Sequence, residues 1–185
     1  TTVIDMQKNT AVITKGNQRY YETMDEDRNP TEVIIYNVNG ETETLDKKYV
    51  YTSKDGAIVG AELTRYDGDK VTQTAVFDMV DGHYFAKNIY NYVYENGTLK
   101  ETNRTVYTYD DKWNVTEGTQ YVLGEDGAET LAQHVIYSYN EDGTRKTTLT
   151  TRYQTDGKTV SGTYEETFDQ DVCVKKTQCL YSADG

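Results

Sequence analysis

Nine of the 14 glycines in this chain directly follow an asparagine or an aspartate, and these dipeptides recur along almost its whole length. Such dipeptides are the strongest short-range signal for a β-hairpin, because both central residues of a type I′ turn need a positive φ. Nine hairpin signals in 185 residues predict an antiparallel meander. Asn-Gly occurs at 39–40 and 96–97, and Asp-Gly at 55–56, 67–68, 81–82, 126–127, 142–143, 156–157 and 184–185.

An aromatic residue stands shortly before nearly every turn, and the spacing of these residues gives the length of the repeat. Ten intervals span the 145 positions from the first to the last, so the repeat is about 14–15 residues, one strand plus one turn. Between turns the side chains alternate with period two, as in Thr147, Leu149 and Thr151 against Thr148 and Thr150. The series is Tyr36, Tyr51, Tyr66, Phe77, Tyr94, Tyr109, Tyr121, Tyr139, Tyr153, Phe168 and Tyr181.

The fold class that follows is all-β, an antiparallel meander of about a dozen hairpin-connected strands forming an open or partly rolled sheet. Leu, Ile, Val and Phe make up 34 of the 185 residues, which predicts shallow burial rather than a two-sheet sandwich. The 18 Tyr and 29 Thr favour ordered strands over disorder. We expect one domain over 1–185, with a less regular part at 1–30 and clear repeats at 31–185.

Composition also limits the partners. The net charge is −12, and no basic run is dense enough to neutralise several phosphates, so we expect no nucleic-acid partner. No apolar stretch reaches the roughly 20 residues of a membrane span, so we expect no membrane insertion. No cofactor motif is present, and we expect no cofactor. On one continuous strand, Cys173 and Cys179 would lie about 20 Å apart, so we predict two unpaired thiols.

Four segments resemble known repeats: "YTYDDKWNVT" (107–116), "YSYNEDGTRKTT" (137–148), "YVYENGTLKET" (92–102) and "YVYTSKDGAIVGAEL" (49–63). They are similar to YD repeats, the Tyr-Asp hairpin units of the Rhs/YD class of secreted and surface-exposed bacterial proteins. The resemblance covers roughly 45–170. It implies an extracellular, cell-surface or periplasmic location. Asn140 stands where the pattern has Asp, and the repeat is shorter than the family's usual twenty or so residues.

The only tryptophan, Trp113, stands where the hairpin motif usually has glycine. One interpretation is functional: an exposed indole at a hairpin tip stacks on a sugar ring or enters a partner's pocket, with Tyr107 and Tyr109 beside it. The other is structural: the indole lies over the neighbouring hairpin, and Asn114 takes the positive φ that glycine normally provides. If the protein binds a ligand, we expect an aromatic contact surface centred on Trp113, Tyr107 and Tyr109.

Other candidate chemistry is sparse. Asp25, Asp27 and Asn29 are spaced like the first three ligands of a calcium loop, but Pro30 stands where such a loop needs glycine, so a solvated acidic loop is the first interpretation. No nucleophile elbow is present. The 31 acidic residues produce many accidental carboxylate pairs, so none of them indicates a glycosidase.

Three functions remain open. The first is a secreted or surface-attached, non-catalytic β-repeat protein that binds or displays, with a glycan or a protein as ligand. The second is a structural spacer or accessory domain of a surface assembly. The third belongs to another class, a carboxylate-based glycan hydrolase. We expect no catalytic residues, and therefore that the protein is not an enzyme.

Overall fold

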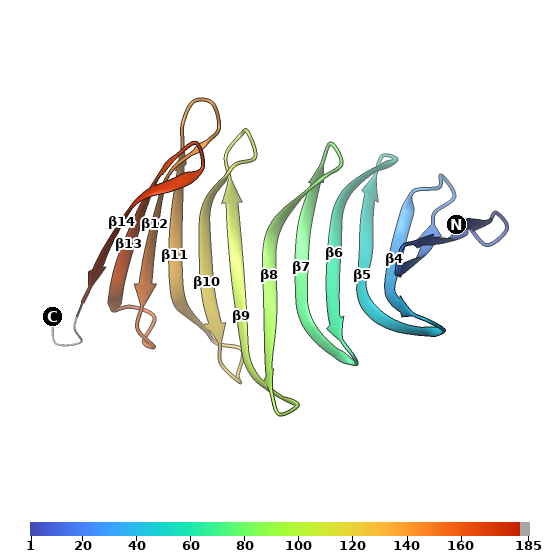
Figure 1. The fold of residues 1–185 in the computed structure, drawn as a ribbon, viewed down its shortest axis with the longest axis horizontal. Helices are drawn as coiled ribbons and strands as arrows, with labels where there is room; N and C mark the ends of the chain where they lie inside the picture. The colour runs from blue at the N-terminus through green and yellow to red at the C-terminus, as the bar shows by residue number, and fades with distance from the viewer. Residues whose placement is uncertain (182–185) are drawn as a thin grey trace. The chain divides into compact units, whose positions relative to one another are not determined.

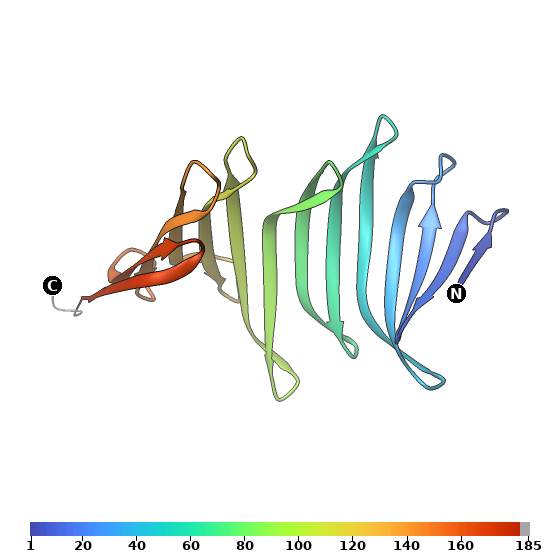
Figure 2. The same cartoon turned by 45° about the horizontal axis from the view of Figure 1, so that its top comes forward.

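The computed structural model describes residues 1–181, which form strands and turns without a helix. The strands pair in chain order in one 14-stranded antiparallel sheet, and the sheet is not closed (Figures 1 and 2). This confirms the predicted fold class, an antiparallel meander in a sheet that does not close. The strands are β1 (Thr2–Asp5), β2 (Thr10–Lys15), β3 (Gln18–Met24), β4 (Pro30–Asn39), β5 (Thr42–Lys54), β6 (Ala57–Asp67), β7 (Lys70–Val80), β8 (His83–Glu95), β9 (Thr98–Tyr109), β10 (Val115–Leu123), β11 (Glu129–Tyr139), β12 (Arg145–Tyr153), β13 (Val160–Asp169) and β14 (Val172–Leu180).

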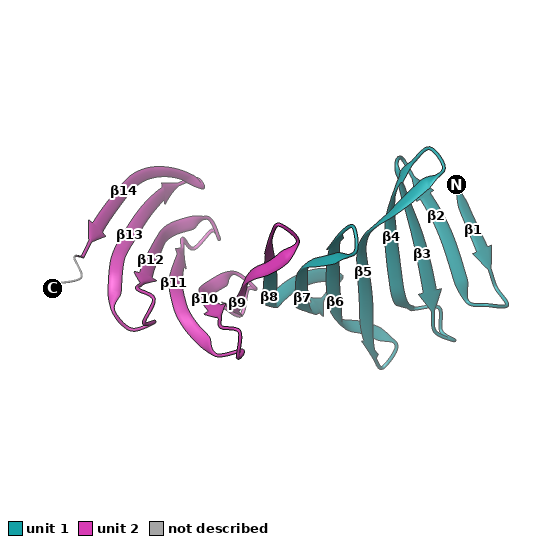
Figure 3. Cartoon of the chain, turned by 90° about the horizontal axis from the view of Figure 1, so that it is seen from below, with its two compact units in different colours: residues 1–92 teal, residues 93–185 magenta. Residues whose placement is uncertain are grey.

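The chain divides into two compact units, residues 1–92 and the part from Val93 onward (Figure 3). We call them unit 1 and unit 2 and describe each by itself. The residues before position 31 form three complete strands, β1 to β3, although their sequence shows the repeat less clearly. That the whole chain is one domain stays a prediction.

The predicted turns fall into three geometries. At 55–56, 81–82 and 96–97 both residues have a positive φ, as a type I′ turn requires. At 39–40 and 67–68 only the glycine does, and it is the first residue of the turn because Asn39 and Asp67 still pair in the ladder. The signals at 126–127, 142–143 and 156–157 lie in longer connections, where again only the glycine has a positive φ. The signal at 184–185 lies outside the described residues.

In unit 1, one face of the sheet holds the buried residues. Val33, Tyr49, Leu63 and Ala75 are successive cross-strand partners on β4 to β7, and directly paired residues point to the same face. Leu63 is 3% exposed and Ala75 is 2% exposed. Burial is nevertheless shallow, since no large side chain in the described residues is less than 2% exposed. This confirms the predicted thin core.

Rings close over the small residues of this face in unit 1. The ring centroids of Tyr49 and Tyr51 on β5 lie 6.1 Å apart and nearly parallel. Tyr84 on β8 lies 6.0 Å from Tyr49 and 5.6 Å edge-on from Phe77, and its hydroxyl is 3.0 Å from that of Tyr51. Tyrosine rings therefore take part in the packing on this face of unit 1.

In unit 2 the corresponding face is lined by small residues, tyrosines and the buried Val135. Tyr107, Gly118, Val135 and Thr150 are successive partners on β9 to β12 and share a face. Leu149 points to the opposite face and is 40% exposed. We call the face that carries Tyr107 the tyrosine face of unit 2.

Cys173 and Cys179 both lie on β14, which confirms the predicted single strand. Neither forms a disulfide. Cys173 pairs with Phe168 and Cys179 with Thr163, and these two partners are an odd number of residues apart on β13, so the thiols belong to opposite faces.

Candidate functional site

Trp113 itself adopts the left-handed conformation, with φ 64°. Our structural interpretation gave this role to Asn114, and it was wrong, because Asn114 is absent from the residues with positive φ. The reason is the hydrogen bonding of the turn between β9 and β10. The Trp113 N–H donates to the Asp110 carbonyl at 3.1 Å, and the Asp110 N–H donates to the Asn114 carbonyl at 3.0 Å, which leaves position 113 to reverse the chain.

The side chain of Asp110 holds this turn together. Its Oδ1 accepts the N–H groups of Asn114 and Lys112 at 2.8 and 2.9 Å, and its Oδ2 accepts the Asn114 Nδ2 at 2.9 Å. The bond from the Asn114 side chain, followed by the backbone bonds of Asn114 and Lys112, lowers the pKa of Asp110 below its usual range. These hydrogen bonds fix the turn, and the turn in turn fixes the position of its fourth residue, Trp113.

The same backbone pattern occurs at 25–29, 124–128 and 140–144, where the first residue bonds to the fifth and the fourth to the first. The fourth residues of these turns are Arg28, Gly127 and Gly143, all with positive φ. An L-residue pays roughly 1–2 kcal/mol for this conformation, which glycine does not. Trp113 is therefore the bulkiest residue at a position that favours the smallest.

Trp113 is 39% exposed at the tip, and its ring centroid lies 6.2 Å from that of Tyr109 at an interplanar angle of 51°. The indole thus contacts Tyr109 of its own hairpin. Tyr107 and Tyr109 lie two residues apart on β9 and share the tyrosine face. The structure therefore brings the three predicted binding residues together, although whether they bind a ligand stays a prediction.

Tyr107 borders a cavity in the middle of this face. Its ring lies over Gly118, 3.4 Å from where a Cβ would stand, and Tyr137 approaches from the other side. Burial raises the pKa of Tyr107, and the electrostatic interaction with Tyr137 raises it further. The cavity of about 180 Å³ exposes aromatic rings and amide groups, which suit hydroxyl-rich ligands. It is lined by Thr105, Tyr107, Gly118, Gln120, Gln133, Val135 and Tyr137.

A second cavity, of about 350 Å³, lies between the β9–β10 turn and the β11–β12 turn. Asp110 and Asn114 line it on one side, and Tyr139 and Asn140 line it on the other. The Tyr139 hydroxyl donates to the Val115 carbonyl at 2.9 Å and so ties β11 to β10 across the face. Sequence reasoning placed Tyr139 in the repeat but did not assign it to a site, since nothing in the sequence aligns neighbouring hairpin tips.

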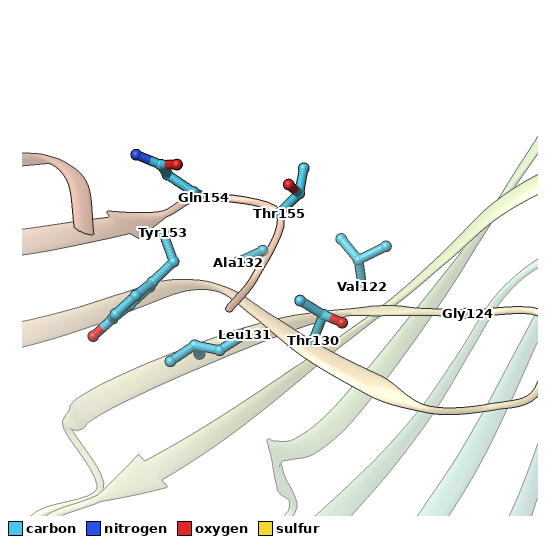
Figure 4. A pocket seen from close by; sticks show the side chains of 8 residues that line it. All are labelled: Val122, Gly124, Thr130, Leu131, Ala132, Tyr153, Gln154 and Thr155. Atoms are coloured by element: carbon cyan, nitrogen blue, oxygen red, sulfur yellow. The ribbon is translucent and has the colours of Figure 1, made fainter. Parts of the chain in front are cut away.

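A third cavity, of about 310 Å³, is the most apolar of these and lies at the opposite ends of β10 to β12. Figure 4 shows Val122 beside Thr130, and the chain that carries Gln154 and Thr155 passing over Ala132. Gly157 is required in that connection, because a Cβ there would come within 3.0 Å of β11. This third cavity lies at the other end of the strands from the turn that carries Trp113.

The candidate calcium residues lie in the β3–β4 turn, the counterpart of the Trp113 turn. Asp25 Oδ1 accepts the Asn29 N–H at 2.8 Å and its Oδ2 accepts the Asn29 Nδ2 at 3.3 Å, so both oxygens already have a partner. Asp27 is exposed in the same turn. Among residues 1–181, no three His, Cys, Asp or Glu side chains gather closely enough to hold a metal ion. The described chain also has no helix that could cross a membrane.

No family model and no curated protein matches the chain. Among solved structures, it is similar to a protein of unknown function from Bacteroides fragilis NCTC 9343, at 12% identity and a TM-score of 0.23, over 72% of this chain and 91% of that one. It is also similar to TcdB2-TccC3, an Rhs/YD-repeat toxin, at 10% identity and a TM-score of 0.22, over 100% of this chain and 11% of that one. TM-scores this low assign the chain neither a family nor a function.

Proposed function

We propose that this chain is a secreted or surface-attached, non-catalytic β-repeat protein of the YD type that binds a glycan on the tyrosine face of unit 2. The four quoted Tyr-rich motifs support the placement among YD repeats. A glycan is favoured over a densely charged polymer such as a nucleic acid because rings and amides, rather than a dense basic patch, line the face.

The observation that carries the proposal is the conformation of Trp113. A half-exposed indole with φ 64° occupies a position where two sister turns have glycine. Contact with Tyr109 offsets part of the backbone strain, but glycine would avoid that strain altogether. Residues held in such conformations cluster at binding and active sites, where their side chain has a use that compensates.

The first test is a glycan array with the purified chain, followed by the Trp113→Gly variant against each glycan that binds. We expect a 5- to 100-fold loss of affinity, about 1–3 kcal/mol, as for a central aromatic anchor. Because glycine relieves the turn, the variant should fold at least as well as the natural chain, so the loss is separable from misfolding.

Arg28→Gly is the matched control, since it relieves the same backbone conformation in the sister turn of unit 1 without removing an aromatic ring. We expect it to leave glycan affinity unchanged. If Trp113→Gly binds as well as the natural chain does, the indole is structural. If the array returns no glycan, the spacer interpretation replaces binding.

A further inference from the structure

Arg145, the first residue of β12, lies on the tyrosine face between two rings. Its Cζ is 5.4 Å from the ring centroid of Tyr137 on β11 and 5.4 Å from that of Phe168 on β13. Both distances are within the range of cation–π attraction. The two flanking strands therefore clamp the guanidinium and fix the direction in which its N–H groups point.

This guanidinium has no anionic partner of its own among the described residues. Arg104, also in unit 2, forms an ion pair with Glu129, whereas no carboxylate among the described residues pairs with the Arg145 side chain. The Asp171 carboxylate accepts the backbone N–H of Arg145 at 2.9 Å rather than its side chain. The Arg145 Nε is buried and has no hydrogen-bond acceptor. The guanidinium hydrogen-bonds the Tyr139 side chain, but no carboxylate neutralises its charge. A partly desolvated cation whose charge is not neutralised is the feature that binds planar oxyanions.

Arg145 also lies in a row with Tyr109, the ring that Trp113 contacts. Tyr109 pairs with Val115, Tyr139 reaches the Val115 carbonyl, and Tyr139 pairs with Arg145. These contacts form a row that crosses the face from β9 to β12, three strand spacings or about 14 Å. A short oligosaccharide laid across the strands spans such a row.

We propose that the ligand is an acidic glycan, in which Arg145 binds the carboxylate of one uronic acid while neutral sugars stack near Trp113 and Tyr109. The inference rests on the proposed glycan-binding function and deepens it. The net charge of −12 disfavours a densely charged polymer, but screening over about 8 Å at physiological salt allows an isolated carboxylate to approach a single arginine.

The first experiment observes Arg145 directly. The Nε–Hε signals of the ¹⁵N-labelled chain are followed by NMR while sodium glucuronate or glucose is added at constant ionic strength. We expect the Arg145 signal to move with glucuronate and not with glucose. The Arg152 signal is the internal control, because Arg152 stacks over Tyr164 on the same strand and face but outside the row. An unmoved Arg145 signal, or equal movement of both arginines, overturns the inference.

The second experiment uses a xylo-oligosaccharide with one glucuronate branch and the same compound with that carboxyl reduced to an alcohol. We expect the natural chain to bind the acid at least 10-fold more tightly. Arg145→Gln should abolish that preference while keeping the weaker neutral binding, Arg145→Lys should keep only part of it, and Arg152→Gln should keep it whole. A preference that survives Arg145→Gln in a folded variant contradicts the assignment.

The two proposals fail in different ways. If Trp113→Gly leaves both affinities unchanged while Arg145→Gln removes the preference, the carboxylate site stands and the indole site falls. If Trp113→Gly weakens both compounds equally and the natural chain does not distinguish them, the glycan surface stands and the role of Arg145 falls.

Discussion

The aromatic faces of the two units use the same residue types in different ways. In unit 1, tyrosine and phenylalanine rings contact one another on the face that buries Leu63 and Ala75. In unit 2, Tyr137, Phe168 and Tyr164 lie beside arginine guanidinium groups, and the face keeps two cavities. In a tyrosine-rich sheet, the rings can therefore pack against one another in one region and contact charged side chains or a ligand in another.

The largest expected effect is on stability in unit 1. Leu63→Ala should lower the free energy of unfolding by about 2–4 kcal/mol, because it leaves a hole under the ring cluster. Leu149→Ala, the same change at a 40% exposed position in unit 2, should cost less than about 1 kcal/mol. Urea unfolding of both variants measures the contrast. Equal losses would mean that unit 2 has a core comparable to that of unit 1.

The two leucines also show what the sequence could not decide. Period-two patterning predicted that Leu149 and Thr148 point to opposite faces, which is correct, but hydrophobicity would choose Leu149 for the inside. The structure buries Thr148 to 7% exposure and leaves Leu149 outside. Thr148 stands directly opposite Tyr137 on β11 and Glu166 on β13, so two large side chains flank a small one, and that three-strand arrangement is invisible in one strand's sequence.

The sequence predicted the turns that contain Asn-Gly or Asp-Gly, but turns without glycine were harder to predict. The turn between β13 and β14 is made by Gln170 and Asp171, both with positive φ and neither glycine. Bulges were also missed: the β11–β12 pairing shifts register between Ser138 and Tyr139, which turns Arg145 onto the tyrosine face. The sequence therefore led to Trp113, Tyr107 and Tyr109 but not to Arg145.

A second, smaller effect concerns the fourth residue of the five-residue turns. Gly143→Trp should lower the free energy of unfolding by about 1–2 kcal/mol, because it introduces a left-handed L-residue. Trp113→Gly should change it in the opposite direction, by less than about 1 kcal/mol, since the lost Tyr109 contact and the added chain entropy offset part of the gain. Thermal unfolding of both variants tests this. A large loss in Trp113→Gly would show that the indole is mainly a structural cover.

An alkaline effect should be strongest in unit 1. Burial first, then the hydrogen bond to Tyr84, raises the pKa of Tyr51, and burial raises the pKa of Tyr49. Because the folded pKa exceeds the unfolded value of about 10, this contribution is complete below about pH 10 and is lost as the pH rises above it. The urea midpoint should therefore fall from pH 9 to 11, and less steeply in Tyr51→Phe. Tyr66→Phe, outside the cluster, should behave like the natural chain.

The smallest expected effect lies on the acid side and in unit 2, in the connection between β12 and β13. The Asp156 carboxylate accepts the Thr159 hydroxyl and the N–H groups of Lys158 and Thr159, and these bonds, the hydroxyl first, lower the pKa of Asp156 to about 2. A folded pKa below the unfolded value of about 3.9 means that the contribution is present above about pH 4 and is lost as the pH falls through about 2.

Because Asp156 is fully exposed, the loss should be local. The amide signals of Lys158 and Thr159 should titrate with a midpoint near pH 2, and Asp156→Asn should remove that transition without moving the amide signal of Leu63 in unit 1. Asp69→Asn, in the Gly68-Asp69 turn of unit 1, is the matched surface change and should leave the Thr159 transition intact. A midpoint near 4 would show that the carboxylate does not hold the connection, and the packing of Gly157 against β11 would then be its main support.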